Sequence, residues 1–272
     1  MKNVLIYTVH KAASMFLHKL GTDLATRMEL DFYSINDKKY YDQIKKASWK
    51  SFIESTAGPS CFGPIRAGED VAQPVFPDSL EQYSVIMHLR DPRDVLTSAY
   101  YSHVYNHKPT ERFNPSDEQR SKWEQQGVDD FVINRIPRVK NEYEALCEHF
   151  LDKENVTFLK YEVMVTNYGE WLKGFLSAFE GIEPRQRTGI KRILGENTRQ
   201  HIYDVLYDKY KAEFAAAKGK EDVYSHKRQV TPGDYDRKLM KSTIDKLNNE
   251  LFTILTSLDY EVKTDSPVSS TS

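Results

Sequence analysis

Three short apolar runs, each followed by a helical pattern, constrain the fold of this chain more than any other feature. These strand candidates are residues 4–9 (VLIYTV), 83–89 (YSVIMHL) and 155–161 (NVTFLKY). Apolar residues then recur at helical spacing over 14–28, from Pro92 to about Asn106, and over 169–179. Alternating strands and helices build right-handed βαβ units. We therefore predict an α/β fold of three layers, in which helices flank a central parallel sheet.

The other segments extend this plan. Residues 61–66 (CFGPIR) are a further strand candidate, although their Gly and Pro disfavour a strand interior. The polar stretch 108–126 contains two prolines and predicts an excursion over the edge of the active site. Residues 128–151 predict a long helix that is interrupted or started by Pro137, and residues 236–258 predict a final amphipathic helix.

Composition restricts the class of protein. The 272 residues are 39% hydrophobic and 29% charged, with a formal net charge of −2, which argues against general nucleic-acid binding. No apolar run is long enough to cross a membrane. Only Cys61 and Cys147 are present, far apart, so we expect no disulfide framework or zinc site and a cytoplasmic location. We expect one domain over 1–263 and a flexible tail over 264–272.

The segment HKAASMF, residues 10–16, joins the first strand to the first helix. The backbone N–H groups of residues 12–15 are then the unpaired donors of a helix N-terminus, which favours an anion. Ser14 adds a hydroxyl donor and Lys11 adds a full charge. The alternative is a plain turn with an exposed lysine. Because the segment has no glycine, it is not a Walker A loop, and an ordinary P-loop NTPase is disfavoured.

A second candidate anion site follows the strand at 83–89. Arg90 stands at the strand end, Asp91 and Pro92 make the turn into the helix, and Ser98 follows within that helix. A strand-end arginine suits bidentate binding of a terminal phosphate, to which a serine can donate a further bond. The alternative is a surface turn in which these charges pair with one another.

These two segments resemble motifs of the sulfotransferases that use 3′-phosphoadenosine 5′-phosphosulfate (PAPS). HKAASMF resembles their P-K-S-G-T-T-W loop, and RDPRDVLTSAYY resembles R-[ND]-P-[KR]-D-V followed by S-Y-Y. The resemblance implies a P-loop-like sulfotransferase fold, PAPS as donor, adenosine 3′,5′-bisphosphate (PAP) as product, and no required metal. It also implies cofactor contacts from two groups of residues, which are Lys11, Ala12, Ala13, Ser14, Met15 and Phe16 in the loop, and Arg90 and Ser98 in the motif.

Two further segments agree with this resemblance. VTFLKYEVM is similar to a family strand that ends in L-x-Y-E-D-[LM], which implies that Tyr161 touches the adenine. RQVTPGDY resembles the loop R-K-G-x-P-G-D-W over the 3′-phosphate, and implies contacts from Arg228, Gln229 and Val230. Phe16 stands where the family has a tryptophan that stacks on adenine, although an aromatic at this spacing can equally be a core residue.

The sequence also departs from the family pattern. Ala13 replaces the usual glycine, and we expect the loop to tolerate it by keeping helical geometry. The family's general base, a histidine, corresponds to Gly68, while Arg66 falls where a lysine contacts the sulfonate. The resemblance to carbohydrate-modifying relatives makes Glu69 and Asp70 the first candidates for the base. His103 and His107 are the second, and they can instead line an acceptor pocket.

We thus expect transfer of a sulfonate from PAPS to a hydroxyl or amine of a small-molecule or carbohydrate acceptor. Lys11 is expected to be the main catalytic residue, with Arg66, Glu69 and Asp70 beside it. Two alternatives remain, a non-catalytic nucleotide-binding module and a kinase or NTPase with a degenerate P-loop. No nucleic-acid or membrane partner and no metal is expected, and the sequence leaves the acceptor and the oligomeric state open.

Overall fold

A computed structural model describes residues 2–66, 75–106, 114–182, 199–214 and 231–262 of the chain. These residues form two compact units. The first unit contains the chain up to Arg90, the segment from Glu148 through helix α9, and Thr231 and Pro232. The second unit contains Asp91–Cys147 and the chain from Gly233 onward. The single domain predicted for 1–263 stays a prediction, and the tail at 264–272 lies outside the described residues.

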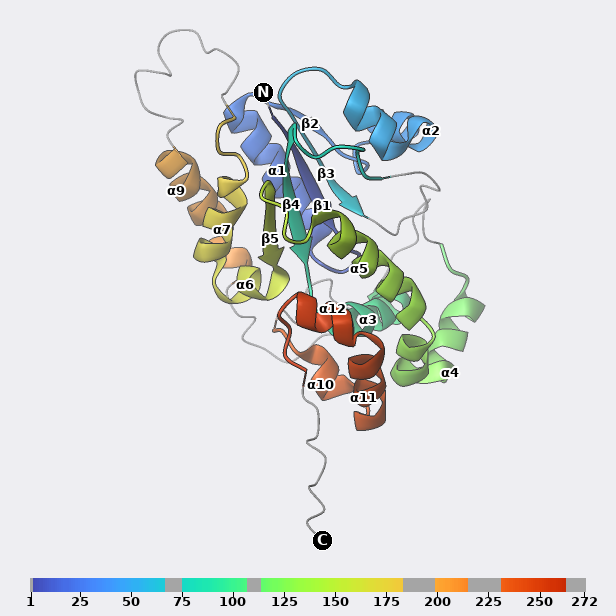
Figure 1. The fold of residues 1–272 in the computed structure, drawn as a ribbon. Helices are drawn as coiled ribbons and strands as arrows, with labels where there is room; N and C mark the ends of the chain where they lie inside the picture. The colour runs from blue at the N-terminus through green and yellow to red at the C-terminus, as the bar shows by residue number, and fades with distance from the viewer. Residues whose placement is uncertain (1, 67–74, 107–113, 183–198, 215–230, 263–272) are drawn as a thin grey trace, which may run out of the picture. The chain divides into compact units, whose positions relative to one another are not determined.

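Five parallel strands form the centre of the first unit (Figure 1), in the order β2-β3-β1-β4-β5. Their bounds are β1 Asn3–Thr8, β2 Asp31–Tyr33, β3 Ser60–Arg66, β4 Tyr83–Leu89 and β5 Val156–Lys160. The predicted parallel sheet is confirmed, and so is the strand at CFGPIR. The short strand β2 was not predicted, because its residues Asp-Phe-Tyr carry no apolar run.

Helices cover both faces of this sheet, as predicted. On one face lie α1 (Ser14–Met28), α6 (Tyr161–Thr166), α7 (Tyr168–Ser177) and α9 (Arg199–Tyr210), which the 3-10 turn η2 (Lys211–Glu213) follows. Their apolar residues share one core with Val4 and Ile6 of β1. On the other face, Phe52 of α2 (Lys38–Ser55) contacts Phe62 of β3. Because side chains alternate along a strand, each strand supplies both cores.

The glycine that disfavoured β3 in the sequence has a structural reason. Gly63 adopts φ 139°, and a Cβ atom added there would lie 2.7 Å from the backbone oxygen of Ile6 in β1. The register between β1 and β3 also shifts between Leu5 and Tyr7. The two strands approach so closely at this point that only glycine fits.

The second unit is helical. Its elements are α3 (Pro92–Tyr101), the π-helical turn η1 (Ser102–Asn106), α4 (Asp117–Ile133), α5 (Ile136–Phe150, whose last three residues belong to the first unit), α10 (Asp234–Lys238), α11 (Lys241–Glu250) and α12 (Phe252–Ser257). The helix predicted from Pro92 to Asn106 therefore changes to π geometry in its last five residues. Pro137 lies at the second position of α5, so it starts that helix rather than interrupting it.

Two predictions for this unit are wrong. Residues 117–126 are not part of a loop, because Ser116 caps a helix by accepting a hydrogen bond from the backbone of Gln119, and this polar helix reaches a kink at Gly127. Residues 236–258 are not one helix. Leu239 and Met240 have extended backbone between α10 and α11, and Leu251 leaves helical geometry before α12.

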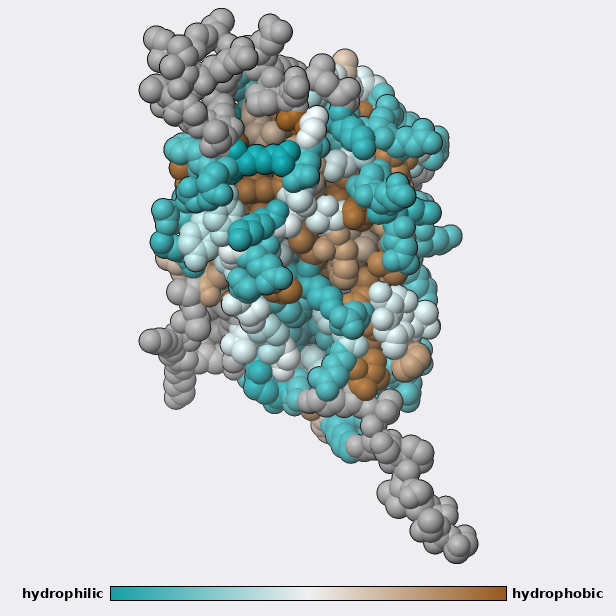
Figure 2. All heavy atoms as spheres, turned by 60° about the vertical axis from the view of Figure 1, so that its left-hand side comes forward, coloured by the Kyte–Doolittle hydropathy of each residue, from teal (hydrophilic) through white to brown (hydrophobic). Residues whose placement is uncertain are grey.

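The hydrophilic character of the surface agrees with the large share of charged residues in the composition. Figure 2 shows hydrophilic residues over much of the face that it presents, with smaller groups of hydrophobic residues between them. Within the described ranges, no helix has both the length and the apolar character that a membrane crossing needs.

Candidate anion-binding site

The loop between β1 and α1 has an unusual backbone. Lys11 and Ala13 both have positive φ, of 65° and 57°, and Ala13 with ψ 33° lies in the left-handed region. The expectation that this loop keeps helical geometry is therefore wrong. A left-handed residue is needed here to turn the chain from the strand into the helix, although each such non-glycine residue costs about 1–2 kcal/mol.

This backbone leaves the N-terminus of α1 open toward the loop. Phe16 and Leu17 donate their N–H groups to the carbonyl of Ala13, at 2.9 and 3.0 Å. Ala13 is the N-cap and has no side chain that caps the helix, so the N–H groups of Ser14 and Met15 remain as donors of the helix N-terminus. Ser14 is 8% exposed, while Met15 is 64% exposed. The macrodipole of this 15-residue helix favours an anion at this point.

Arg90 reaches the same loop from the end of β4. Its Nη1 atom donates a hydrogen bond of 3.1 Å to the carbonyl oxygen of Lys11. Its guanidinium carbon also lies 4.5 Å from the centroid of the Tyr161 ring, at the start of α6. Arg90 is 5% exposed, so its charge is little screened by solvent. The structure thus brings together three residues that the sequence placed in separate motifs.

Phe16 points away from this group, into the core beside α1. It is 9% exposed, and its ring centroid lies 4.7 Å from that of Phe214 and 5.4 Å from that of Tyr210. Both contacts are edge-to-face, as in packed aromatic cores. This packing favours the core interpretation of Phe16, and the stacking of adenine on its ring stays a prediction.

A row of polar residues, two of them buried, lies near the strand ends next to the loop. In the sheet register, Thr8 of β1 pairs with Arg66 of β3 on one side and with His88 of β4 on the other. Thr8 and His88 are fully buried, and among the described residues neither the hydroxyl of Thr8 nor either ring nitrogen of His88 has a hydrogen-bond partner. Burial lowers the pKa of His88 to about 3, so its imidazole is neutral.

The second unit contains Ser98 and a buried ion pair that follows Arg90 in the chain. Arg93 is 2% exposed and donates to both oxygens of Asp91, at 3.0 and 2.6 Å. It also donates to the side chain of Asn248 at 2.7 Å and to the carbonyl of Glu261 at 2.9 Å. Two charges of this motif, those of Asp91 and Arg93, therefore pair with one another, as the alternative interpretation had it, but in the interior rather than at the surface.

Asp94 has a role that the sequence did not indicate. It is fully buried on α3, and its two carboxylate oxygens accept hydrogen bonds from the backbone N–H groups of Gly233 and Tyr235, at 2.9 and 3.0 Å. It thereby fixes the beginning of α10. Ser98, one turn further along α3, is only partly buried. The sequence feature that could have indicated this role is the alternation of basic and acidic residues in a segment that otherwise follows an apolar helical pattern.

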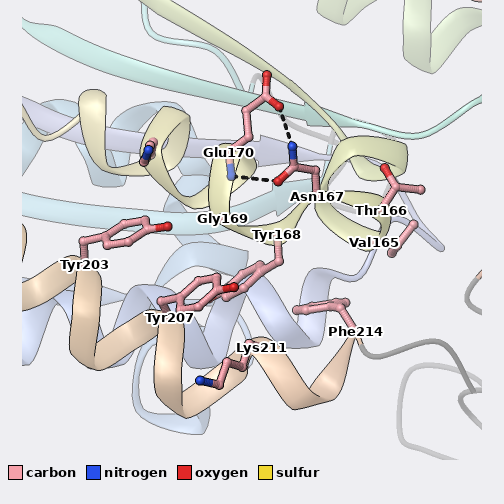
Figure 3. Close-up of a pocket in the computed structure, with 11 residues that line it drawn as sticks. Val165, Thr166, Asn167, Tyr168, Gly169, Glu170, Tyr203, Tyr207, Lys211 and Phe214 are labelled. Atoms are coloured by element: carbon pink, nitrogen blue, oxygen red, sulfur yellow. Dashed lines mark hydrogen bonds between the residues drawn. The ribbon is translucent and has the colours of Figure 1, made fainter.

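A cavity of about 660 Å³ lies elsewhere in the first unit, beside α6, α7 and α9 (Figure 3). Tyr203 and Tyr207 line it with stacked rings 5.6 Å apart, and Tyr168 continues the stack at 6.0 Å from Tyr207. None of the predicted site residues lines this cavity. Tyr168 and Phe214 nevertheless belong both to its wall and to the packing around Phe16.

The sequence pattern that defines the sulfotransferase domain matches residues 72–252, which is more than half of the chain. The chain belongs to the sulfotransferase family. The matched region includes Arg90, Ser98 and Tyr161, while the loop that contains Lys11 precedes it.

One solved structure shows that this sulfotransferase-family protein also shares a fold with a known protein, and a second is reported for comparison. Mouse sulfotransferase SULT7A1 complexed with PAP aligns with a TM-score of 0.50 and 12% identity, over 93% of this chain and 84% of that one. Retinol dehydratase in complex with androsterone and inactive cofactor PAP aligns with a TM-score of 0.45 and 10% identity, over 97% of this chain and 84% of that one. No curated protein matches the sequence.

Several predicted residues of this sulfotransferase-family protein lie outside the described ranges, which are Glu69, Asp70, His107, Arg228, Gln229 and Val230. Arg66 ends β3, beside Thr8 of β1. The ring of His103 packs against Trp123 and Phe131, with centroids 5.5 and 5.7 Å away, as a structural aromatic does. Among the residues that the structure describes, no three histidine, cysteine or acidic side chains cluster as metal ligands do, and metal independence stays a prediction.

Proposed function

We propose that this protein transfers a sulfonate from PAPS to a hydroxyl or amine acceptor and releases PAP. One observation supports this function above all. The hydrogen bond from Arg90 to the carbonyl of Lys11 joins the two candidate anion-binding segments at one edge of the sheet. Ligands of open parallel sheets bind at this edge, beyond the carboxyl ends of the strands. The membership in the sulfotransferase family gives the reaction type.

The residues present suit an anionic phosphosulfate. Lys11 offers an ammonium, while Ser14 and Met15 offer backbone N–H groups at a helix N-terminus. The hydroxyl of Thr8 is buried without a partner among the described residues, as expected of a group that faces a polar ligand. Arg90 would hold the 3′-phosphate. Among the other expected contacts, Ser98 and Arg228 would also bind this phosphate, and Tyr161 would contact the adenine.

The chemistry follows from these donors. The bond between sulfur and the bridging oxygen of the donor breaks as the acceptor oxygen or nitrogen bonds to sulfur from the opposite side. The bridging oxygen becomes anionic, and Lys11 would stabilise that charge, with the dipole of α1 behind it. A sulfonate carries less charge than a terminal phosphate, so these cations and dipoles can replace a metal ion. Arg66 would contact the sulfonate beside Lys11.

The acceptor must lose a proton to a base. Glu69 or Asp70 would accept it, since they come three and four residues after Arg66, which ends β3. The acceptor class under this proposal is a small molecule or a carbohydrate, and the protein acts in the cytoplasm.

Release of PAP tests the function directly. The protein is incubated with PAPS and a panel of phenols, alcohols, amines and sugars, and PAP is measured by mass spectrometry. We expect PAP to form in proportion to a sulfated product for at least one acceptor class. Binding of PAP without transfer to any acceptor would support the non-catalytic module instead. Turnover that depends on ATP and Mg²⁺ would support the kinase alternative.

A further inference from the structure

The cavity beside α6, α7 and α9 has the size of a small-molecule site. Its volume of about 660 Å³ lies within the range of about 300–1,000 Å³ that is typical of such sites. The described residues that line it all belong to the first unit. They come from two sides, which are the end of α6 with the beginning of α7, and α9 with η2 (Figure 3). The chemistry of these two sides determines which ligand fits.

One wall of the cavity is a stack of tyrosine rings. Tyr203 and Tyr207 are one turn apart on α9, and their ring planes differ by 13°. Tyr168 of α7 continues the stack, with a plane 12° from that of Tyr207. Tyr168 is 6% exposed, whereas the other two are only partly buried, so they keep accessible aromatic surface at the cavity. Such surface favours another aromatic ring as its partner.

Gly169 lets this stack approach the backbone of α7. A Cβ atom added at Gly169 would lie 3.0 Å from the hydroxyl oxygen of Tyr203 and 3.3 Å from Cε2 of Tyr207. Both rings therefore lie against the helix at a residue that has no side chain. This contact restricts the two rings before any ligand binds, which lowers the entropy cost of binding.

Two ammonium groups lie beside the tyrosine rings. Lys173 of α7 has its ammonium 5.8 Å from the centroid of the Tyr203 ring. The ammonium of Lys211, in η2, is 5.4 Å from the centroid of the Tyr207 ring. Both lysines line the cavity. An anionic group on a bound ring would therefore meet positive charge.

Acidic groups offset this positive charge only in part. Among the described residues that line the cavity, Glu170 has the only carboxylate, and it accepts a hydrogen bond of 2.7 Å from the side chain of Asn167 (Figure 3). Asp208 pairs with Lys211 at 2.6 Å, but both side chains are exposed, so this pair contributes little. The lining thus favours a ligand with a single negative charge.

We propose that this cavity is a second binding site, which takes a planar aromatic molecule with one negative charge, an aryl carboxylate or an aryl sulfate. The ring would pack against Tyr203 and Tyr207, and its anionic group would face Lys173 and Lys211. The site is separate from the one proposed for PAPS, and ligand binding to it does not depend on the transfer reaction.

Calorimetric titration of the wild-type protein with naphthoate tests the proposal. Naphthol, which has the rings without the charge, and cyclohexanecarboxylate, which has the charge without an aromatic ring, are the comparisons. Naphthoate should bind at least about threefold more tightly than either of them. Naphthyl sulfate then distinguishes the two ligand sources, because tighter binding than naphthoate would indicate aryl sulfates and weaker binding aryl carboxylates. Excess PAP should leave naphthoate affinity unchanged.

Variants locate the ligand in the cavity. Tyr203→Ala should weaken naphthoate binding by about threefold to tenfold, the loss expected for one aromatic contact. Lys211→Gln should weaken it by about twofold to fivefold, as for one exposed charge pair. Lys209→Gln is the matched control, because Lys209 is also on α9 but pairs with Asp23 at 2.5 Å and does not line the cavity. It should leave the affinity unchanged.

Gly169→Ala tests the wall without removing a ring or a charge. The new Cβ atom would displace the hydroxyl end of Tyr203, so naphthoate affinity should fall while circular dichroism shows an unchanged fold. If Tyr203→Ala does not fold, Tyr203→Leu takes its place, since leucine keeps apolar volume but has no flat ring.

Each of four results would overturn the proposal. The first is a wild-type protein that does not bind naphthoate. The second is displacement of naphthoate by PAP, which would assign the cavity to the donor site. The third is equal naphthoate affinity in the wild-type, Tyr203→Ala and Lys211→Gln proteins, which would place the ligand elsewhere. The fourth is binding of naphthol or cyclohexanecarboxylate as tight as that of naphthoate.

Discussion

Lys11 combines a strained backbone with a charged side chain, and the two properties can be separated by mutation. Alanine has the same Cβ atom as lysine, so Lys11→Ala leaves the backbone cost at φ 65° nearly unchanged. The ammonium is lost together with the methylene groups that carry it. If it stabilises the leaving oxygen, turnover should fall about 10²–10³-fold. Steady-state kinetics with PAPS and circular dichroism measure the turnover and the fold.

Lys45→Ala is a suitable control for this prediction, because Lys45 lies on α2 and its ammonium is 5.7 Å from the ring of Tyr41 rather than near the loop. It should leave turnover unchanged. A Lys11→Ala protein with wild-type turnover would mean that another cation stabilises the leaving oxygen.

At the scale of single residues, the sequence predicted which residues lie at the strand end better than it predicted their backbone conformations. The strand-to-helix junction located Lys11 and Ser14, because an apolar run and a helical pattern meet there. It did not predict the left-handed backbone of Ala13, because the contacts of this loop, such as the hydrogen bond from Arg90 to Lys11, come from residues far away in the chain. The full burial of the polar side chain of His88 was not predicted either, since a histidine within an apolar strand resembles any other buried residue.

At the scale of elements, Asp94 links α3 to the beginning of α10. Replacing one of its carboxylate oxygens with an amide nitrogen should weaken this link. Asn has a single acceptor oxygen, so Asp94→Asn leaves either Gly233 or Tyr235 without an acceptor for its N–H group. The expected loss is about 1–3 kcal/mol of unfolding free energy, which is typical of an unsatisfied buried donor. Urea unfolding monitored by circular dichroism measures it.

Asp129→Asn provides the comparison within the same unit. Asp129 accepts one hydrogen bond of 2.9 Å, from the backbone of Met240 in an exposed setting. Its amide variant can still accept that bond, so the unfolding free energy should change by less than about 0.5 kcal/mol. Equal losses for the two variants would contradict the bidentate role of Asp94.

Gly63 tests the close approach of β1 and β3. Gly63→Ala places a Cβ atom 2.7 Å from the backbone oxygen of Ile6, and a backbone atom cannot move aside as a flexible side chain does. We expect a loss of more than about 4 kcal/mol, or no folded protein. Gly127→Ala has the same kind of backbone, with φ 78°, but no atom within 4 Å of the new Cβ. Alanine is strained at φ 78° and ψ 168°, so this change should cost about 1–3 kcal/mol, and thermal unfolding separates the two outcomes.

The helices and strands also show where the hydrophobic pattern of the sequence predicts the structure and where it does not. The strands of the sheet were predictable because buried parallel strands are apolar throughout, as at 83–89. The helix at 117–126 was not, because its residues are polar and only Phe131 and Val132 of α4 are buried. Its signal was the capping serine at 116, followed by two acidic residues. Breaks such as that at Met240 depend on contacts with other helices, which no local pattern records.

At the scale of the whole molecule, the charge is almost balanced, with a formal net charge of −2. Attraction of an anion therefore has to come from local donors rather than from a general positive field. Stabilisation by a bound ligand can therefore distinguish a specific site for PAP from a surface that binds any polyanion. A ligand present at 100 times its dissociation constant stabilises a protein by about 2.7 kcal/mol. For a protein of this size, that corresponds to a rise of roughly 5–10 °C in melting temperature.

We expect this rise with PAP and with PAPS, and little change with ADP, Mg-ATP or a DNA duplex at equal phosphate concentration. Because Arg90 is 5% exposed, added salt should weaken the effect of PAP less than it weakens binding at an exposed basic surface. Differential scanning fluorimetry at two ionic strengths measures both points. A duplex that stabilises as strongly as PAP would show a general polyanion surface. A larger rise with Mg-ATP than with PAP would instead favour the kinase alternative, because a kinase site gains its affinity from the terminal phosphate and its metal ion.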